Sequence, residues 1–390
     1  MKKIMRTKNL VIEKNIRRLF TVFTIVLALF FQSPVSVYAQ EGEKNIDVSE
    51  AKQVEIAGTK LLHLKSSIVN QEYDLYINLP RFYDDTTKTF PVLYLLDAQW
   101  DFTLLNALFG QQYYDGFVPG IIIVGITWGG DNPNYDQLRA RDFTPTDLHQ
   151  YSPTGGAMKF IQFIKQELIP FVDSKFRTTK NDRTLMGCSL GGLFTLYTLF
   201  NETDLFNRYV LTSPAIGWDN GVLYTYEKNN AEKNSDLSAR VFMGIGEYEN
   251  TTDFQKFFDT LKSRNYSSLR IQTKVLDGVG HSGGKAEGYT KGLQFVFAKS
   301  PISLSEDILN QYAGEYELAR GFTVKISVDN GNLIVLTPDS NSITLYPESE
   351  NEFYTVGQYL LAHFQKNSAG EVTGCQIEQY TGKRNLKKVN

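Results

Sequence analysis

The sequence predicts an α/β protein, in which a mostly parallel sheet with helices on both faces is followed by a small antiparallel β domain. Three observations lead to this fold class. Short apolar runs alternate with helical patterns up to residue 298. Tyrosine-rich segments in which apolar and polar residues alternate then fill residues 313–380. The chain has 390 residues, 42% of them hydrophobic, so each part can bury a core of its own.

The first 39 residues have the pattern of a secretory signal peptide. They carry a net charge of +6 and contain a short apolar run over residues 19–31. A transmembrane helix needs roughly 20 apolar residues, and the small residues Val37 and Ala39 precede a cleavage point. We therefore expect a secreted or periplasmic protein with no stable membrane span after cleavage; the alternative is an uncleaved anchor. The remaining chain carries a net charge of −9, which argues against nucleic acid as a partner.

Short apolar segments predict the strands of the first domain, which we assign to residues 40–300. Two alternating segments at its start indicate paired strands, at 61–64 and 73–77. Further short runs indicate the strands of a covered sheet, at 92–96, 121–124, 184–186, 209–211, 241–243 and 271–276. Apolar residues at helical spacing predict helices at 158–168, 193–199, 254–261 and 289–297. Such alternation of strands and helices produces a mostly parallel sheet.

The second domain, residues 301–390, has only strand patterns. Turn signals at Asn330-Gly331 and Ala369-Gly370 separate alternating segments such as 322–328, 333–336 and 359–364. We predict six to eight antiparallel strands without a helical crossover, joined to the first domain by a linker over residues 299–307.

The clearest chemical signal is Gly187-Cys188-Ser189-Leu190-Gly191, a Gly-x-Ser-x-Gly motif. It follows the strand predicted at 184–186 and opens the helix predicted at 193–199. In that context the motif is the nucleophile elbow of the α/β-hydrolase fold, where small residues permit a strained turn that exposes the serine hydroxyl. We predict that Ser189 is a catalytic nucleophile.

A serine nucleophile needs a base, and an imidazole has a suitable pKa. In this fold the base is a histidine on a loop after the last strand. Three of the four histidines do not fit: His63 and His149 precede the elbow, and His363 lies in the second domain. His281 directly follows the strand at 271–276 and is therefore the predicted base.

The acid that orients this histidine is expected on the loop after the strand at 241–243, between serine and histidine in chain order. Gly246-Glu247-Tyr248-Glu249 offers two carboxylates there, and Asp253 follows. We favour Glu249, which has room to reach back from the loop. Glu247 and Asp253 remain alternatives.

The oxyanion formed during acyl transfer needs two backbone N–H donors. One is expected from Leu190, directly after the nucleophile. The other is expected from the loop after the strand at 92–96, where we assign Gln99 with Ala98 as its neighbour.

Five segments together resemble the putative-esterase family, whose members include S-formylglutathione hydrolases, feruloyl esterases and trilactone siderophore esterases. Three of them carry the general resemblance: Pro91–Ala98, Arg139–Pro145 and Arg183–Gly192. Two more, Thr212–Asn220 and Gly246–Glu249, look closest to the siderophore esterases. The resemblance spans about residues 55–298.

The resemblance implies a serine esterase without metal or cofactor, with the nucleophile, base and oxyanion donors at Ser189, His281, Gln99 and Leu190. It also places Arg141 in the substrate cleft, where a cation suits an anionic or catecholate ligand. The alternative for Arg141 is a structural salt bridge with Asp142.

Tryptophans follow three predicted strands at the edge where parallel α/β sheets bind ligands. Trp218, with Trp100 and Trp128, could line an acyl pocket, and packing in the core is the alternative. The predicted function is hydrolysis of a small-molecule carboxylic ester through an acyl-enzyme, on a siderophore-like or carbohydrate ester. Acyl transfer on the same scaffold and a non-catalytic binding protein are the competing interpretations.

Overall fold

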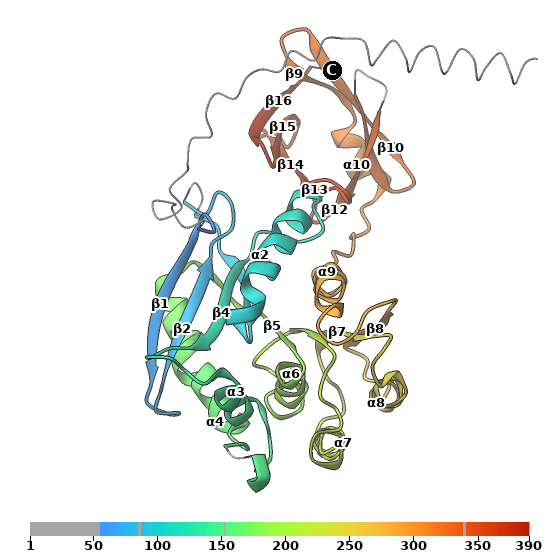
Figure 1. Ribbon diagram of the computed structural model, residues 1–390. Coiled ribbons are helices and arrows are strands. Elements are labelled where there is room, and N and C mark those ends of the chain that lie inside the picture. The colour runs from blue at the N-terminus through green and yellow to red at the C-terminus, as the bar shows by residue number, and fades with distance from the viewer. Residues whose placement is uncertain (1–54, 85–86, 152, 338–340, 390) are drawn as a thin grey trace, which may run out of the picture. The chain divides into compact units, whose positions relative to one another are not determined.

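Eight strands form the sheet of the first domain, in the order β1-β2-β4-β3-β5-β6-β7-β8 (Figure 1). The computed structural model describes residues 55–84, 87–151, 153–337 and 341–389, so the predicted signal peptide lies outside the described residues. β1 pairs with β2, and β2 with β4, in antiparallel fashion, whereas all other neighbours are parallel. The strands are β1 (Thr59–Ser66), β2 (Gln71–Asn78), β3 (Phe90–Leu95), β4 (Ile122–Trp128), β5 (Thr178–Cys188), β6 (Arg208–Thr212), β7 (Ala239–Gly246) and β8 (Leu269–Leu276).

Helices cover both faces of this sheet, which confirms the predicted fold class (Figure 1). α2 and α9 share one apolar cluster with the sheet, and helices from α3 to α8 contribute to the other. The helices are α2 (Ala98–Tyr114), α3 (Tyr135–Phe143), α4 (Ala157–Phe163), the π-helical η3 (Ile164–Leu168), α5 (Ile169–Lys175), α6 (Leu190–Asn201), α7 (Leu223–Lys233), α8 (Thr251–Ser263) and α9 (Gly284–Val296), with short 3₁₀ turns η2 (His149–Tyr151) and η4 (Trp218–Asn220).

The predicted helices do not include α2, α3 and α7, nor α5, which continues the helix predicted at 158–168. In α2 the buried positions recur at helical spacing, but Asp101 and Gln112 occupy two of them and interrupt the apolar pattern. α7 similarly buries Glu227 and Asn230 beside Leu223. Because polar residues occupy buried positions in α2 and α7, the periodicity of apolar residues did not indicate these two helices.

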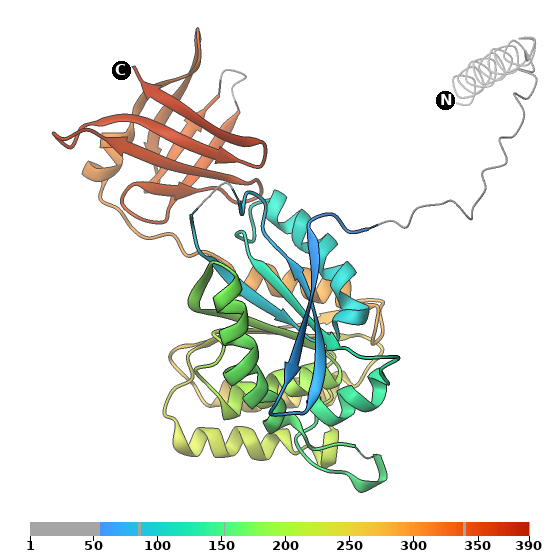
Figure 2. The same ribbon diagram turned by 90° about the vertical axis from the view of Figure 1, so that its left-hand side faces the viewer.

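The second domain is a closed antiparallel barrel of eight strands, β9 to β16 (orange to red in Figure 2). One face of each strand points inward, as in β10, where Val324 and Ile326 are buried and Lys325 between them is exposed. The strands are β9 (Gly314–Ala319), β10 (Phe322–Asp329), β11 (Asn332–Leu336), β12 (Ser342–Pro347), β13 (Glu352–Tyr354), β14 (Leu360–Lys366), β15 (Val372–Gln379) and β16 (Gly382–Lys388).

A helix absent from the prediction, α10 (Glu306–Tyr312), precedes the barrel and includes the end of the expected linker. The Ser305 hydroxyl accepts a hydrogen bond from the Ile308 N–H and caps the helix. Leu309 and Tyr312 are fully buried in the apolar core of the barrel. α10 is therefore an integral part of the second domain.

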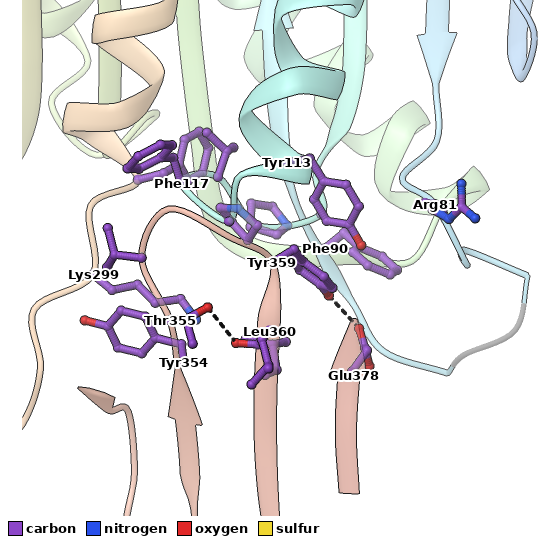
Figure 3. Close-up of a pocket in the computed structure, with 18 of the residues that line it drawn as sticks. Arg81, Phe90, Tyr113, Phe117, Lys299, Tyr354, Thr355, Tyr359, Leu360 and Glu378 are labelled. Carbon is purple, nitrogen blue, oxygen red and sulfur yellow. Dashed lines mark hydrogen bonds between the residues drawn. The ribbon is translucent and has the colours of Figure 1, made fainter. Parts of the chain in front are cut away.

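The barrel contacts the first domain through aromatic residues. The Tyr359 N–H donates to the Tyr114 carbonyl at 3.0 Å, and the rings of Tyr359 and Tyr113 are 4.6 Å apart. A cavity of about 430 Å³ lies here, beside Phe90 at the start of β3 (Figure 3). We call this contact between the barrel and the first domain the seam. Parallel strands all start at one edge of a sheet. The seam, beside the start of β3, therefore lies at the edge opposite the ends of β5, β7 and β8. Within the described ranges, no helix is long and apolar enough to span a membrane.

Candidate active site

Ser189 lies in a strained turn between β5 and α6. Its φ is 60° and its ψ is −118°, a conformation that residues other than glycine rarely adopt. The turn is held by β6 and its loop: the Ser189 N–H donates to the Thr212 carbonyl at 3.1 Å, and the Ser189 carbonyl accepts from Ala215. A Cβ on Gly187 would lie 2.7 Å from the backbone of Gly191, so only glycine fits there. Strain of this kind concentrates at functional sites.

Glu249 and His281 form a hydrogen-bonded pair at the same edge of the sheet. Glu249 lies three residues after the end of β7, and His281 lies between β8 and α9. The distance from Glu249 Oε2 to His281 Nδ1 is 2.6 Å. This contact leaves the other ring nitrogen, Nε2, free to act as a base.

The second carboxylate oxygen of Glu249 is also bound. Oε1 accepts from the Ser213 hydroxyl at 2.6 Å and from the Gly246 N–H at 2.9 Å. Burial of the carboxyl opposes its ionisation, but the hydrogen bonds from Ser213, His281 and Gly246 outweigh it and lower the pKa of Glu249. The Glu249 carboxylate is thus held in one orientation, with hydrogen bonds to both of its oxygens.

The two alternative acids are engaged elsewhere. Glu247 accepts from the Gly278 N–H at 2.7 Å. Asp253 belongs to the first turn of α8, where it contacts the side chain of Asn250 at 2.6 Å. Of the three candidates, Glu249 is therefore the one in contact with His281.

A carboxylate neighbour alone does not distinguish His281, because the other histidines have one too. The distances are 2.7 Å for His63–Asp74, 3.2 Å for His149–Asp147 and 3.5 Å for His363–Glu352. Two further properties separate His281 from them. Its partner carboxylate is only 17% exposed, and both residues follow strands that run parallel to β5 and end at the same edge.

The candidate oxyanion donors, Leu190 and Gln99, lie at the starts of two helices. Leu190 is the first residue of α6, and Gln99 is the second residue of α2. A helix leaves the N–H groups of its first residues without an intrahelical acceptor, so both are free to bind an anion. The side-chain amide atoms of Gln99 are also buried and have no hydrogen-bond partner in the described part of the chain.

The structure gives the candidate substrate-binding residues other contacts. The Arg141 guanidinium pairs with Asp142 at 2.7 Å and 3.0 Å, the structural alternative that the sequence left open. The Trp218 indole N–H donates to the Thr146 hydroxyl at 3.0 Å, and its ring is partly buried. Trp128 is a core residue, whereas Trp100 is half exposed. Roles for Arg141 and Trp218 in substrate binding stay predictions.

Cys188, directly before Ser189, does not compete with it as a nucleophile. The thiol is buried, and this burial raises its pKa to about 11. At neutral pH it is therefore protonated and unreactive.

Ser213 is a functional candidate that the sequence analysis did not assign. It follows β6 in the segment Thr212-Ser213-Pro214, has a φ of 47°, and contacts the oriented carboxylate. The available signal was its place two residues after the strand predicted at 209–211, at the edge that holds the other site residues.

The fold and the strained elbow define an α/β-hydrolase. The chain belongs to the putative esterase family, whose model matches residues 66–289. Residues 298–388 match a second family, a domain of unknown function (DUF3471).

Similar proteins include several esterases that act on siderophores. The ferri-bacillibactin esterase BesA of Bacillus subtilis is 28% identical over 248 residues, which is 58% of this chain and 85% of BesA. A siderophore triacetylfusarinine C esterase of Aspergillus fumigatus is 30% identical over 53% of this chain and 75% of its own length. All of these matches support carboxylic-ester hydrolysis as the reaction class of this chain.

Solved structures show the same likeness. The BES protein from Bacillus cereus superposes with a TM-score of 0.59 at 28% identity, covering 64% of this chain and 98% of that protein. An IroE-like serine hydrolase from Shewanella oneidensis has a TM-score of 0.54 at 27% identity, covering 61% of this chain and 80% of its own.

Proposed function

We propose that this protein is a serine esterase that hydrolyses carboxylic esters of siderophores through an acyl-enzyme on Ser189. The observation that carries the proposal is the pair of His281 and doubly anchored Glu249 at the sheet edge where the strained elbow presents Ser189. The family and the siderophore esterases similar to this chain supply the substrate class.

The reaction proceeds in two halves. The Ser189 hydroxyl attacks the ester carbonyl carbon while His281 Nε2 takes its proton, and Glu249 stabilises the resulting imidazolium. The N–H groups of Leu190 and Gln99 hold the oxyanion. His281 then donates the proton to the leaving alkoxide, which departs as the alcohol. A water molecule then attacks the acyl-enzyme while His281 takes its proton. The bond between the acyl carbon and Ser189 Oγ breaks, Ser189 Oγ recovers the proton from His281, and the carboxylic acid is released.

The test is a substrate screen on purified protein and its Ser189→Ala variant. The substrates are ferri-bacillibactin, enterobactin, a feruloylated sugar and p-nitrophenyl acetate, with products identified by mass spectrometry. We expect ring opening of the siderophores by the wild type only, together with labelling of Ser189 by a fluorophosphonate.

Other outcomes separate the competing functions. Transfer of the acyl group to an added alcohol in preference to water would identify an acyltransferase. Cleavage of the feruloylated sugar alone would replace siderophores with carbohydrate esters. A protein that neither takes the label nor cleaves any ester would be a binding protein. Export stays a prediction, and detection of a chain starting at Gln40 outside the cytoplasm would test it.

A further inference from the structure

Asp101 is a buried carboxylate that the proposed reaction does not use. It lies in the first turn of α2 and is 2% exposed. Its Oδ1 accepts from Lys285 Nζ at 2.7 Å, and its Oδ2 accepts from the Tyr289 hydroxyl at 2.7 Å. Both partners belong to α9, so one carboxylate joins α2 to residues 184 and 188 positions away in the chain.

Stability alone is a weak reason for such a cluster. Removing two charges from water costs several kcal/mol per ion, about as much as the pair regains, and apolar residues of similar size often serve equally well. Lys285 is only 18% exposed on its side chain and Tyr289 is fully buried, so the full cost applies. The position of the cluster supplies a better reason.

The cluster joins the two loops that must cooperate in catalysis. Asp101 lies two residues after Gln99, the candidate oxyanion donor, and Lys285 lies four residues after His281. The chain between Gln99 and Asp101 is helical, and α9 begins at Gly284. A shift of Asp101 against Lys285 would therefore change the distance between the oxyanion donor and the base.

A second buried pair holds the other side of the same loop. Asp97, at the N-cap of α2, has a φ of 54° and accepts two hydrogen bonds from Arg139 of α3, at 3.0 Å and 2.8 Å. Its carboxylate also lies 3.5 Å from the point where a Cβ on Gly191 of α6 would stand. The start of α2 is thus hydrogen-bonded to α3 on one side and to α9 on the other.

We infer that Asp101, Lys285 and Tyr289 form a positioning cluster, which fixes the distance between Gln99, the candidate oxyanion donor of α2, and His281. This inference rests on the proposed function. The three residues touch no reacting atom and act through the loops they hold. Misplacement of a catalytic group by about 1 Å can cost about 100-fold in rate, so their loss should lower kcat. KM should change little, because none of the three is among the residues predicted to bind substrate, Arg141 and Trp218.

The experiment compares cluster variants with two matched controls, all in the full chain. The variants are Lys285→Met, Tyr289→Phe, which keeps the ring, and Lys285→Arg, which keeps the charge. Glu227→Gln is the charge control, since buried Glu227 accepts two 2.7 Å hydrogen bonds from Arg264 away from the site.

Gln112→Met is the helix control. Gln112 and Gln294 join the same two helices, α2 and α9, at their far ends through a 2.6 Å hydrogen bond. If the cluster only docked α9 on α2, loss of the Gln112–Gln294 pair should lower kcat as much as loss of the cluster does.

The readouts are kcat and KM for p-nitrophenyl acetate, the rate of the acylation burst, and the thermal midpoint. Active sites are counted by fluorophosphonate titration. We expect Lys285→Met to lower kcat and the burst rate by about 10- to 100-fold and Tyr289→Phe by about 3- to 10-fold, with KM changed less than 3-fold. Lys285→Arg should recover part of the loss. Both controls should lower the midpoint and keep kcat.

Two failures are distinguishable. An active wild type whose cluster variants lose stability but keep kcat per titrated site overturns the inference alone. Equal losses of kcat in the controls overturn it as well. A wild type without esterase activity overturns the proposed function and this inference with it.

Discussion

The two domains differ in where their backbones are strained. In the sheet domain, three non-glycine residues with positive φ follow neighbouring strands of the sheet at the edge of the candidate site: Asp97 after β3, Ser189 after β5 and Ser213 after β6. Seven others lie elsewhere in the described part of that domain, among them Phe82 beside the cavity at the seam. In the described part of the barrel, from Gly314 on, Asn330 alone has this property, and it belongs to an Asn-Gly hairpin turn. The other positive-φ residues there are glycines, most of them in or beside turns and bends.

This difference indicates that the proposed chemistry belongs to one edge of the sheet domain, whereas the barrel contributes packing. At Asp97, Ser189 and Ser213 the strained backbone lies beside hydrogen bonds that orient side chains at one edge of the sheet, whereas the barrel turns use residues that adopt positive φ at little cost. The barrel also meets the first domain at the opposite edge, through the seam. Changes at the active-site edge should therefore affect kcat, and changes at the seam should affect stability.

Replacing the nucleophile should have the largest effect. Ser189→Ala is expected to lower kcat by about a millionfold, because no other group can form the acyl-enzyme. Circular dichroism and the thermal midpoint should stay near the wild type. More than about 1% residual activity in the pure variant would assign the nucleophile to another residue.

Replacing the acid should have the next largest effect. Glu249→Gln removes the charge that stabilises protonated His281, and we expect a loss of about 10³- to 10⁴-fold in kcat. Glu247→Gln is the matched control on the same loop and should lose less than 10-fold. Equal, mild losses in both variants would indicate a Ser–His dyad.

The pH profile should show one acid limb. kcat/KM should rise with pH along a single limb, because a general base must lose its proton before it can accept one. The pKa of Glu249 is lowered, so this carboxylate stays ionised at neutral pH. Its ionised form also stabilises the fold above its unfolded pKa of about 4.3, and this contribution is lost as the pH falls through the lower folded value. A second ionisation on the acid limb would contradict this assignment.

A seam substitution should have the smallest effect on turnover. Gly116 has a φ of 74°, and a Cβ there would lie 2.4 Å from the Gln358 carbonyl of the barrel. Gly116→Ala should lower the free energy of unfolding by about 1–2 kcal/mol from backbone strain and by about 1–3 kcal/mol more from the clash. kcat for p-nitrophenyl acetate should stay within about 2-fold.

Gly321→Ala separates the two contributions. Gly321 has a φ of 81° but open space around it, so only the backbone cost should appear in its free energy of unfolding. A fall in kcat of more than 10-fold in Gly116→Ala alone would show that the seam communicates with the active-site edge.

Much of the sheet and the elbow could be predicted because their signals are local. The apolar runs mark the strands, and the glycines around Ser189 mark a tight turn, of which Gly187 admits no Cβ. The pairing of Glu249 with His281 could also be predicted, because in this fold the acid lies between the serine and the histidine in chain order. α2 could not be predicted, because the partners that permit Asp101 and Gln112 to be buried lie more than 180 residues away, on α9. The pairing of Arg141 with Asp142 could not be predicted either, because the sequence is the same whether the guanidinium is paired or free.

The burial of Cys188 has a practical consequence for measuring motion in this protein. The chain has only one other cysteine, Cys375, which is also buried and unpaired, and burial raises its thiol pKa to about 12. Maleimides and nitroxide reagents react with thiolates, so neither natural cysteine should be labelled. A single cysteine introduced at Tyr248, which is 74% exposed beside Glu249, would carry the only probe. Spectroscopy of that loop during turnover then needs no prior removal of cysteines.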